Sequence, residues 1–277
     1  MEIFLSIALL VMVAAALPVF CGATWTALEH SRPMRLSRAG ASWFFRESAA
    51  NIIVVATIAI GWWPNSPTRK RKQRDIADTP SASRDRLPVL LVHGYGLNRG
   101  CFTFLQTYLH TRGYEWVWAI NNRPNSSPIP VFAKRLGRAI EQLKAEAEAD
   151  QVDIVAHSMG GVIAAYALKE FGYAPHVRRL VTVGTPWAGS KTHVFGFRRE
   201  AIDIRPDGEI INALAGYTGD TVAIWSQSDH LVLPSKSGCP SHARCIEMPN
   251  LGHQEMLISA RVFRCVADVL LAGGEEE

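Results

Sequence analysis

The sequence predicts an α/β protein, a three-layer sandwich with a mostly parallel sheet, preceded by one or two N-terminal membrane helices. From Leu87 onward, apolar β-prone runs alternate with helical stretches, which is typical of parallel strands covered by helices on both faces. Before them comes a polar stretch without apolar periodicity, and before that two apolar stretches. We therefore expect a membrane anchor region at 1–63, a basic polar linker at 64–86 and one folded domain at 87–277.

The composition is slightly apolar for a soluble protein of 277 residues, with 48% hydrophobic and 19% charged residues. The apolar excess lies mostly before the linker. The net charge of +4 has its most concentrated source in the run from Arg69 to Arg74. Nucleic-acid binding needs basic residues spread over a folded face with aromatic residues between them. A single solvated basic run beside an apolar segment instead indicates a membrane-flanking or linker element, so we expect no nucleic-acid partner.

The first apolar stretch, Ile3 to Phe20, is free of charge. Its length is close to the roughly 20 residues that span a bilayer as a helix. A cleaved signal peptide is the alternative, but such peptides begin with positive charge, and here Glu2 precedes the apolar run. Ala23 and Ala27 are small enough for a cleavage site, so this alternative stays open, and an uncleaved anchor is favoured.

The second apolar stretch, Ala49 to Trp63, is shorter and ends in paired tryptophans followed by Pro64. Tryptophan suits the headgroup boundary of a membrane. The stretch fits a short second span, an interfacial helix or a buried core helix. Basic residues lie both between the two apolar stretches and after the second one, so the positive-inside rule does not decide which side of the membrane the folded domain faces.

The elements of the folded domain follow from the apolar runs. The strands are expected at Leu87–Val92, Trp116–Ile120, Val152–Val155, Leu180–Val183 and Val222–Trp225. Helices are expected at Val131–Ala149 and Val162–Phe171. This alternation places helices between successive parallel strands.

The strongest chemical signal is the run IVAHSMGG, which ends with Gly161 and stands between a strand and a helix. A nucleophile on a sharp strand-to-helix turn needs small residues two positions before and after it. Ala156 and Gly160 occupy those positions around Ser158, so the pattern is A-x-S-x-G. A small-residue turn in an unrelated α/β protein is the alternative for the pentapeptide alone.

The loop His93-Gly94-Tyr95-Gly96 directly follows the first strand. An oxyanion hole needs two backbone N–H groups aimed at the developing negative charge. We expect these donors to be Tyr95, in this loop, and Met159, directly after Ser158. A plain strand-end turn is the alternative for His93-Gly94.

An acid and a base should follow the nucleophile in the order Ser, Asp, His. Asp229 lies in the loop after the strand that ends at Trp225, and His253 follows a glycine further on. Several other residues fit less well: Asp203 and Asp207 lie in an irregular segment, Asp220 precedes the strand, His230 adjoins the acid, and His242 lies between two cysteines. We expect Ser158, Asp229 and His253 to form the catalytic set.

Five motifs, LLVHGYG, DIVAHSMGG, LVTVGTPWAGS, SQSDHLVLP and NLGHQEML, occur in this order over residues 87–270. With them the chain resembles bacterial triacylglycerol lipases of the α/β-hydrolase superfamily. The resemblance implies the α/β-hydrolase fold and a lid over an acyl pocket at about 187–215. Two features depart from the family pattern: Trp187 stands where such lipases often have His, and the N-terminal apolar stretches are extra.

The residues and the resemblance together predict a membrane-anchored serine hydrolase that cleaves carboxylic esters, with lipid or acylglycerol esters as the expected substrates. The mechanism requires no metal or organic cofactor, and the expected partners are the ester substrate and the membrane. Acyl transfer by the same triad and a catalytically silent binding protein are the alternative functions. Cys239 and Cys245 could bridge a small loop in an oxidising compartment or be free thiols. The sequence indicates no oligomeric state.

Overall fold

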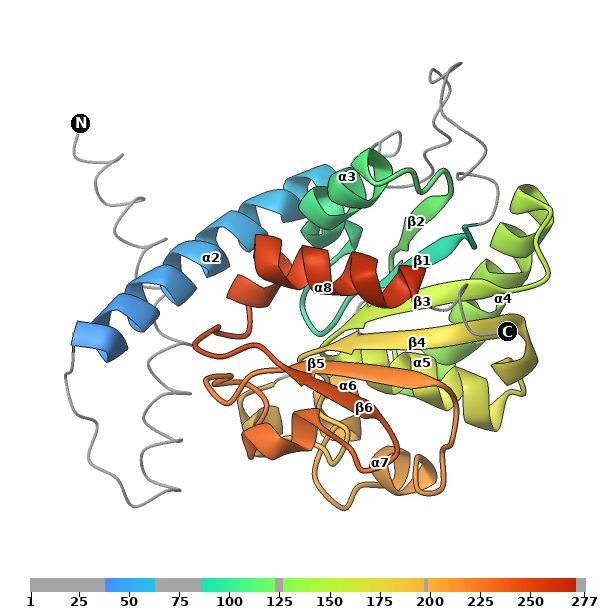
Figure 1. Ribbon diagram of the computed structural model, residues 1–277. Coiled ribbons are helices and arrows are strands. Elements are labelled where there is room, and N and C mark those ends of the chain that lie inside the picture. The colour runs from blue at the N-terminus through green and yellow to red at the C-terminus, as the bar shows by residue number, and fades with distance from the viewer. Residues whose placement is uncertain (1–37, 63–85, 123–126, 197–198, 273–277) are drawn as a thin grey trace.

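The computed structural model describes residues 38–62, 86–122, 127–196 and 199–272. At its centre lies a six-stranded sheet in the order β2-β1-β3-β4-β5-β6, in which every described pair is parallel (Figure 1). The strands are β1 (Val89–Val92), β2 (Val117–Ile120), β3 (Val152–His157), β4 (Val177–Val183), β5 (Thr221–Trp225) and β6 (Arg244–Glu247). The predicted α/β class with a parallel sheet is confirmed.

Helices cover both faces of the sheet (Figure 1). They are α2 (Arg38–Trp62), α3 (Thr103–Thr111), α4 (Ile129–Ala147), α5 (Met159–Glu170), α6 (Arg199–Asp203), α7 (Glu209–Ala213) and α8 (Ala260–Leu271). Successive strand side chains point to opposite faces. Leu90 and Ile154 accordingly pack with α4 and α5, whereas Leu91 and Val155 pack with α3 and α8. One buried cluster lies between the sheet and the helices on each of its two faces, so helices, sheet and helices make the three layers that the sequence predicts.

The two largest differences from the predicted strands have a common reason, which is that charged residues interrupt the apolar run, whereas the other strands begin and end within two residues of the prediction. β4 begins at Val177 rather than Leu180 because Arg178 and Arg179, which interrupt the run, form ion pairs with acidic side chains. β6 has the sequence RCIE and no fully buried residue. It lies at the edge of the sheet and, among the described strands, pairs with β5 only, so its side chains need not be apolar to be accommodated.

The strand order creates a natural site for chemistry. The chain passes from β1 to β2 on one side, then returns to β3 on the other side of β1. In open parallel sheets, ligands bind beyond the carboxyl ends of the strands at such a switch point. The loop 93–96 follows β1 and Ser158 follows β3, so both predicted motifs meet there.

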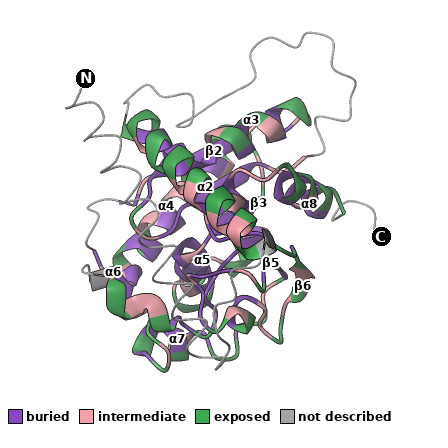
Figure 2. Cartoon of the chain, turned by 90° about the vertical axis from the view of Figure 1, so that its left-hand side faces the viewer, coloured by how far each residue is buried: buried purple, intermediate pink, exposed green. Residues whose placement is uncertain are grey.

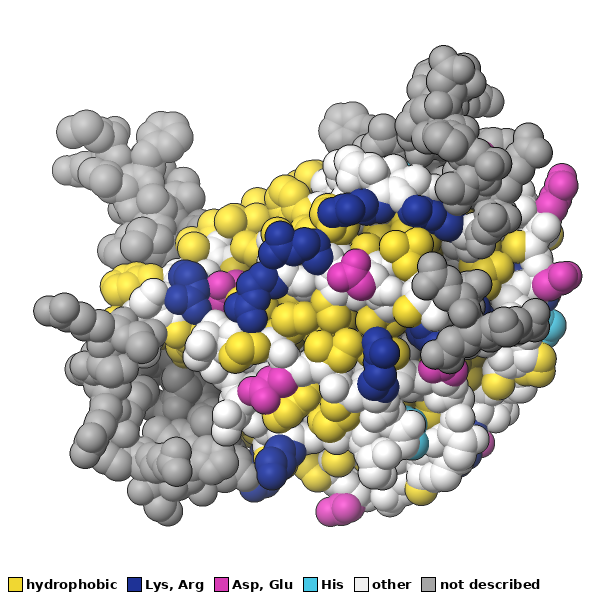
Figure 3. Space-filling model, viewed as in Figure 1, with side chains coloured by type: hydrophobic (Ala, Val, Ile, Leu, Met, Phe, Trp, Pro, Cys, Tyr) yellow, Lys and Arg dark blue, Asp and Glu magenta, His cyan; other side chains and the backbone are white. Residues whose placement is uncertain are grey.

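The helix α2 is 25 residues long and covers the second apolar stretch and the residues before it. One face is buried against the rest of the protein, and its members recur every three or four residues: Glu47, Ala50, Val54, Thr57 and Gly61. Figure 2 shows α2 lying across the outside of the domain, with its remaining residues exposed or of intermediate burial. Exposed large apolar side chains include Phe45, Ile52, Ile53, Val55, Ile60 and Trp62. Hydrophobic side chains accordingly gather over α2 on the surface (Figure 3).

The C-terminal half of α2 is fastened to the segments that follow β1 and β2. Asn98 donates a side-chain hydrogen bond to the carbonyl oxygen of Ile58 at 2.8 Å, and Asn121 donates one to that of Gly61 at 3.2 Å. The last four carbonyl groups of a helix have no partner within the helix, and Gly61 O is one of them, so Asn121 caps α2 from the domain. Val54 also belongs to the buried cluster that contains α3 and α8.

Among the described residues, α2 is long and apolar enough to cross a membrane over Gly40–Trp62. Its one buried face and one exposed apolar face combine features of the interfacial and core-helix alternatives. The predicted first span at Ile3–Phe20 lies outside the described residues, as does nearly all of the predicted linker at 64–86.

Candidate active site

Ser158 occupies a strained turn between β3 and α5. Its φ of 56° and ψ of −131° place a non-glycine residue at positive φ, a conformation that residues with a β-carbon rarely adopt. The turn is held from two sides: the N–H of Ser158 donates to Val183 O at 2.9 Å, and the hydroxyl of Thr185 donates to Ser158 O at 2.9 Å. Ser158 is partly exposed although its chain neighbours are buried. The side chain of Ser158 is therefore partly accessible at the start of α5.

The glycines of the two motifs allow β1, its loop and α5 to approach closely. A β-carbon on Gly160 would lie 2.3 Å from the carbonyl oxygen of Val92, and one on Gly94 would lie 2.7 Å from the β-carbon of Ser158. Both distances are far shorter than carbon atoms tolerate. Ala156, which replaces the usual glycine, is fully buried, so an alanine fits below the turn as expected.

His93 holds the loop after β1. Its Nε2 accepts a hydrogen bond from the backbone N–H of Asn122 at 3.0 Å, so Nδ1 carries the proton and donates to Gly94 O at 2.9 Å. Burial lowers the pKa of His93 to about 4, which keeps the ring neutral. The loop is thus fixed with Gly94 against Ser158 and Tyr95 next in the chain. Met159 is the first residue of α5, where backbone N–H groups lack helical partners.

Asp229 and His253 form a buried pair. The Nδ1 of His253 lies 2.7 Å from Oδ2 of Asp229, and the two residues are 2% and 3% exposed. The other carboxylate oxygen accepts the backbone N–H groups of Leu231 and Val232 at 2.8 and 2.9 Å. Asp229 is therefore held at both oxygens and directed at the imidazole, which is the arrangement that fixes a histidine tautomer.

Opposite charges decide the pKa values of this pair. Burial alone would raise the pKa of Asp229, but the charge of His253 and the hydrogen bond to it lower the pKa overall. Burial alone would lower the pKa of His253, but Asp229 raises it above the ordinary value of histidine. The pair is thus suited to hold a proton on the imidazole opposite a charged carboxylate.

His157, which the sequence analysis did not single out, joins the two halves of the site. Its ring centroid lies 4.7 Å from that of His253, and its Nε2 lies 3.3 Å from His253 O. Burial, followed by the charge of His253, lowers its pKa to about 3. Since His157 directly precedes Ser158, a neutral buried ring links the loop of His253 to the turn of Ser158. The sequence feature that could have singled out His157 is its position directly before Ser158.

The alternative acids and bases lie in other surroundings than the Asp229–His253 pair. Asp203 accepts the backbone N–H of Ile129 at 2.8 Å, and Asp220 forms an ion pair with Arg179. Asp207 adopts a positive φ of 56° in the turn before α7. The ring of His242 packs against Trp187 and that of His230 against Trp43 of α2. The structure brings Asp229, rather than these acids, to His253.

The described residues of the region predicted as a lid form three short helices, of which α7 ends beside Lys169 in the last turn of α5, at the end of that helix away from Ser158. They are the 3-10 helix Lys191–Phe195, α6 and α7. Trp187 is buried and stacks on Tyr217 at a centroid distance of 5.9 Å. Val194, Phe195 and Ile202 are exposed. A β-carbon on Gly196 would lie 3.4 Å from the Tyr95 hydroxyl, so this region adjoins the loop after β1.

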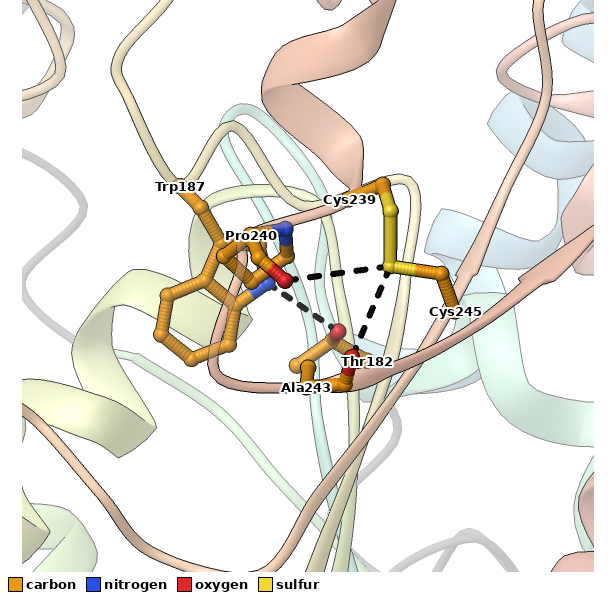
Figure 4. The surroundings of a disulfide bond; sticks show 6 residues. All are labelled: Thr182, Trp187, Cys239, Pro240, Ala243 and Cys245. Carbon is orange, nitrogen blue, oxygen red and sulfur yellow. Dashed lines mark hydrogen bonds between the residues drawn. A yellow bond between two sulfur atoms is a disulfide. The ribbon is translucent and has the colours of Figure 1, made fainter.

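Cys239 and Cys245 are joined by a disulfide, with their Cα atoms 5.6 Å apart (Figure 4). The sequence left this pairing open. The same view shows the indole of Trp187, whose Nε1–H donates to the Thr182 hydroxyl at 3.3 Å. The disulfide closes the small loop that leads into β6.

Comparisons with known proteins agree with this architecture. A model of the alpha/beta hydrolase family matches residues 89–243, more than half of the chain. A Bacillus licheniformis lipase in its mature form is similar at 13% identity and a TM-score of 0.63, over 71% of this chain and 96% of that chain. Aspergillus fumigatus lipase B is similar at 16% identity and a TM-score of 0.59, over 83% and 74%. At these identities the structural likeness shows the fold alone.

Proposed function

Because the chain belongs to the alpha/beta hydrolase family, we propose that it is a serine hydrolase that cleaves carboxylic esters through Ser158, His253 and Asp229. Family membership and the lipase neighbours support hydrolase activity in general. The observation that carries the finer proposal is the buried Asp229–His253 pair, 2.7 Å apart, linked through His157 to the strained turn of Ser158.

The proposed reaction is two-step acyl transfer. His253 takes the proton of the Ser158 hydroxyl as the oxygen attacks the ester carbonyl carbon, and Asp229 stabilises the imidazolium. The tetrahedral intermediate expels the alcohol, which receives the proton from His253. Water then attacks the acyl-enzyme with His253 again as base, releasing the acid and restoring the serine. We assign the backbone N–H groups of Tyr95 and Met159 to the oxyanion.

We propose lipid or acylglycerol esters as the substrates and the membrane as the place of action. The exposed apolar face of α2 and the exposed apolar residues of the lid region support this assignment. An amphipathic or apolar helix face lowers its free energy by entering the acyl region of a bilayer. The lid residues Val194, Phe195 and Ile202 would then contact lipid as well.

Acyl transfer to an alcohol other than water uses the same triad, and a silent binding protein needs no triad at all. The product distinguishes them: a hydrolase releases free acid in water, whereas a transferase forms a new ester when an acceptor alcohol is added. A binding protein does neither.

The proposal is tested with the full chain in detergent micelles, using p-nitrophenyl esters from acetate to palmitate and a fluorophosphonate probe. We expect release of p-nitrophenol, faster for longer acyl chains, and probe attached to the peptide that contains Ser158. Mass spectrometry that finds the probe on another residue, or no turnover of any ester, would refute the proposal. Preference for acetate would refute only the lipid substrate.

The pH dependence of kcat/KM follows from the raised pKa of His253. The base must be neutral to accept the serine proton, so activity should rise with pH through a pKa above the ordinary histidine value. Asp229, Glu47, His157 and His230 are the titratable groups that act on it. In Asp229→Asn the rise of kcat/KM with pH, the limb that reports the pKa of His253, should move to lower pH. The value of kcat should fall ~10⁴-fold. A limb that does not move would contradict the assignment of Asp229.

A further inference from the structure

A buried carboxylate of α2 contacts the loop that carries His253. Glu47 is fully buried, and its two oxygens accept the backbone N–H groups of Gln254 at 2.6 Å and of Glu255 at 2.8 Å. These are the two residues directly after His253 in the chain. A carboxylate that accepts backbone N–H groups forms stronger hydrogen bonds than a neutral acceptor. The loop is thus held by a residue from a distant part of the sequence.

The position of this carboxylate is unfavourable for a helix that only anchors the chain. Burial raises the pKa of Glu47 to about 7, against the opposing effect of the two backbone hydrogen bonds. An apolar side chain would avoid this desolvation. The presence of an acid here therefore indicates that the loop of His253 needs a side chain that accepts its two successive backbone N–H groups.

Arg46, the preceding residue, holds the same loop at two further points. Its Nε lies 2.9 Å from Oε1 of Glu255, and its Nη2 donates to Asn250 O at 2.8 Å. The other oxygen of Glu255 accepts the N–H of Gly252 at 3.3 Å. Adjacent residues of α2 therefore bind the loop on both sides of His253.

The fit between helix and loop is close. A β-carbon on Gly252 would lie 2.2 Å from Oε2 of Glu47, so the residue before His253 must be glycine for the carboxylate to reach its partners. α2 also contacts the loop of the acid. Trp43 packs edge-on against His230, the residue after Asp229, and Oε1 of Glu47 lies 3.6 Å from Nδ1 of His230.

We infer that Glu47, supported by Arg46, is a positioning residue that holds the 250–255 loop so that His253 meets both Asp229 and Ser158. This inference rests on the proposed function, since it assigns the geometry of that triad. It makes α2 part of the support of the active site. A mutation away from the chemistry that misplaces a catalytic group by about 1 Å can lower the rate ~100-fold.

The test is Glu47→Gln in the full chain in detergent. Glutamine has the same shape, but its amide group offers one oxygen and turns an N–H₂ group toward the second backbone N–H. Active sites are counted with the fluorophosphonate probe, so that unfolded protein does not enter the rate. We expect kcat per labelled site to fall by up to ~100-fold, with KM for the p-nitrophenyl ester changed less than about twofold.

Asp153→Asn is the matched control. Asp153 is also a fully buried carboxylate, and it lies in β3 at the end of the sheet away from Ser158, where it pairs with Arg178. We expect this variant to lower the melting temperature while kcat per labelled site stays within about twofold of the wild type. Arg46→Gln, at a side chain that is 44% exposed, gives a milder second variant in which kcat should fall less than in Glu47→Gln.

Wild-type kcat per labelled site in both Glu47→Gln and Arg46→Gln, with only the melting temperature lowered, would overturn the inference. An equal loss of kcat per labelled site in Asp153→Asn would do so too, because the effect would then follow the loss of any buried carboxylate rather than the contacts of Glu47. Failure of the proposed function gives a different result, since the probe would not label Ser158 in the wild-type chain.

Discussion

Replacing Ser158 with alanine should lower kcat for p-nitrophenyl esters by ~10⁶-fold. The substitution removes the only atom of this residue that can attack the carbonyl carbon and leaves the backbone of the turn unchanged. Residual hydrolysis above the rate in water would come from the oxyanion donors and from substrate binding. The rate of p-nitrophenol release and the loss of fluorophosphonate labelling measure the effect.

Stability separates a chemical loss from a structural one. Serine and alanine both carry a β-carbon, so the φ of 56° at position 158 is equally strained in both, and the melting temperature should change little. Ser259→Ala serves as the control, because Ser259 precedes α8 without a side-chain capping bond. Turnover that survives in Ser158→Ala, or an equal loss in Ser259→Ala, would rule out Ser158 as the nucleophile.

A chain that begins at Arg86 should lose at least ~100-fold in activity although it keeps the whole proposed triad. Such a chain lacks α2 and with it both contacts of Glu47 to the loop of His253. It also exposes the surface that buries Val54, a side chain whose burial contributes about 1.5–3 kcal/mol. We expect aggregation or a lowered melting temperature together with slow turnover per labelled site.

The control for this deletion is a chain that begins at Arg38, the first residue of α2. In detergent it should retain the kcat of the full chain, because every described contact of α2 is kept. A soluble fragment from Arg86 with full activity would show that α2 is dispensable and would also contradict the role of Glu47.

The strands that could be predicted are those with continuous apolar runs. Buried parallel strands need apolar side chains on both faces, and β1, β2 and residues 222–225 of β5 meet this condition. β6 was not predicted because an edge strand with half-exposed residues lacks that pattern. The docking of α2 was not predicted either, since an apolar run has the same composition whether it enters a membrane or covers a protein.

The candidate site was predicted as far as it depends on local motifs. Ser158, Asp229 and His253 each follow a strand, and the order of the chain restricts the choice. The partners of Glu47 lie more than 200 residues away in sequence, and no local pattern links position 47 to the loop of His253. An acidic residue in the first half of a helix is also typical of a solvated helix N-terminus, so Glu47 does not stand out in the sequence.

The contact between Gly61 and Gly100 bears on whether α2 could be exchanged for another hydrophobic helix. A β-carbon on Gly100 would lie 2.0 Å from Thr57 O, and one on Gly61 would lie 2.0 Å from the side-chain oxygen of Asn98. The two backbones meet without side chains between them, so the helix fits in one register only. Fusing the domain to a generic membrane anchor would keep it at a bilayer but would not restore this joint. Under the proposed function and the inferred role of Glu47, attachment and catalysis are therefore not separable modules.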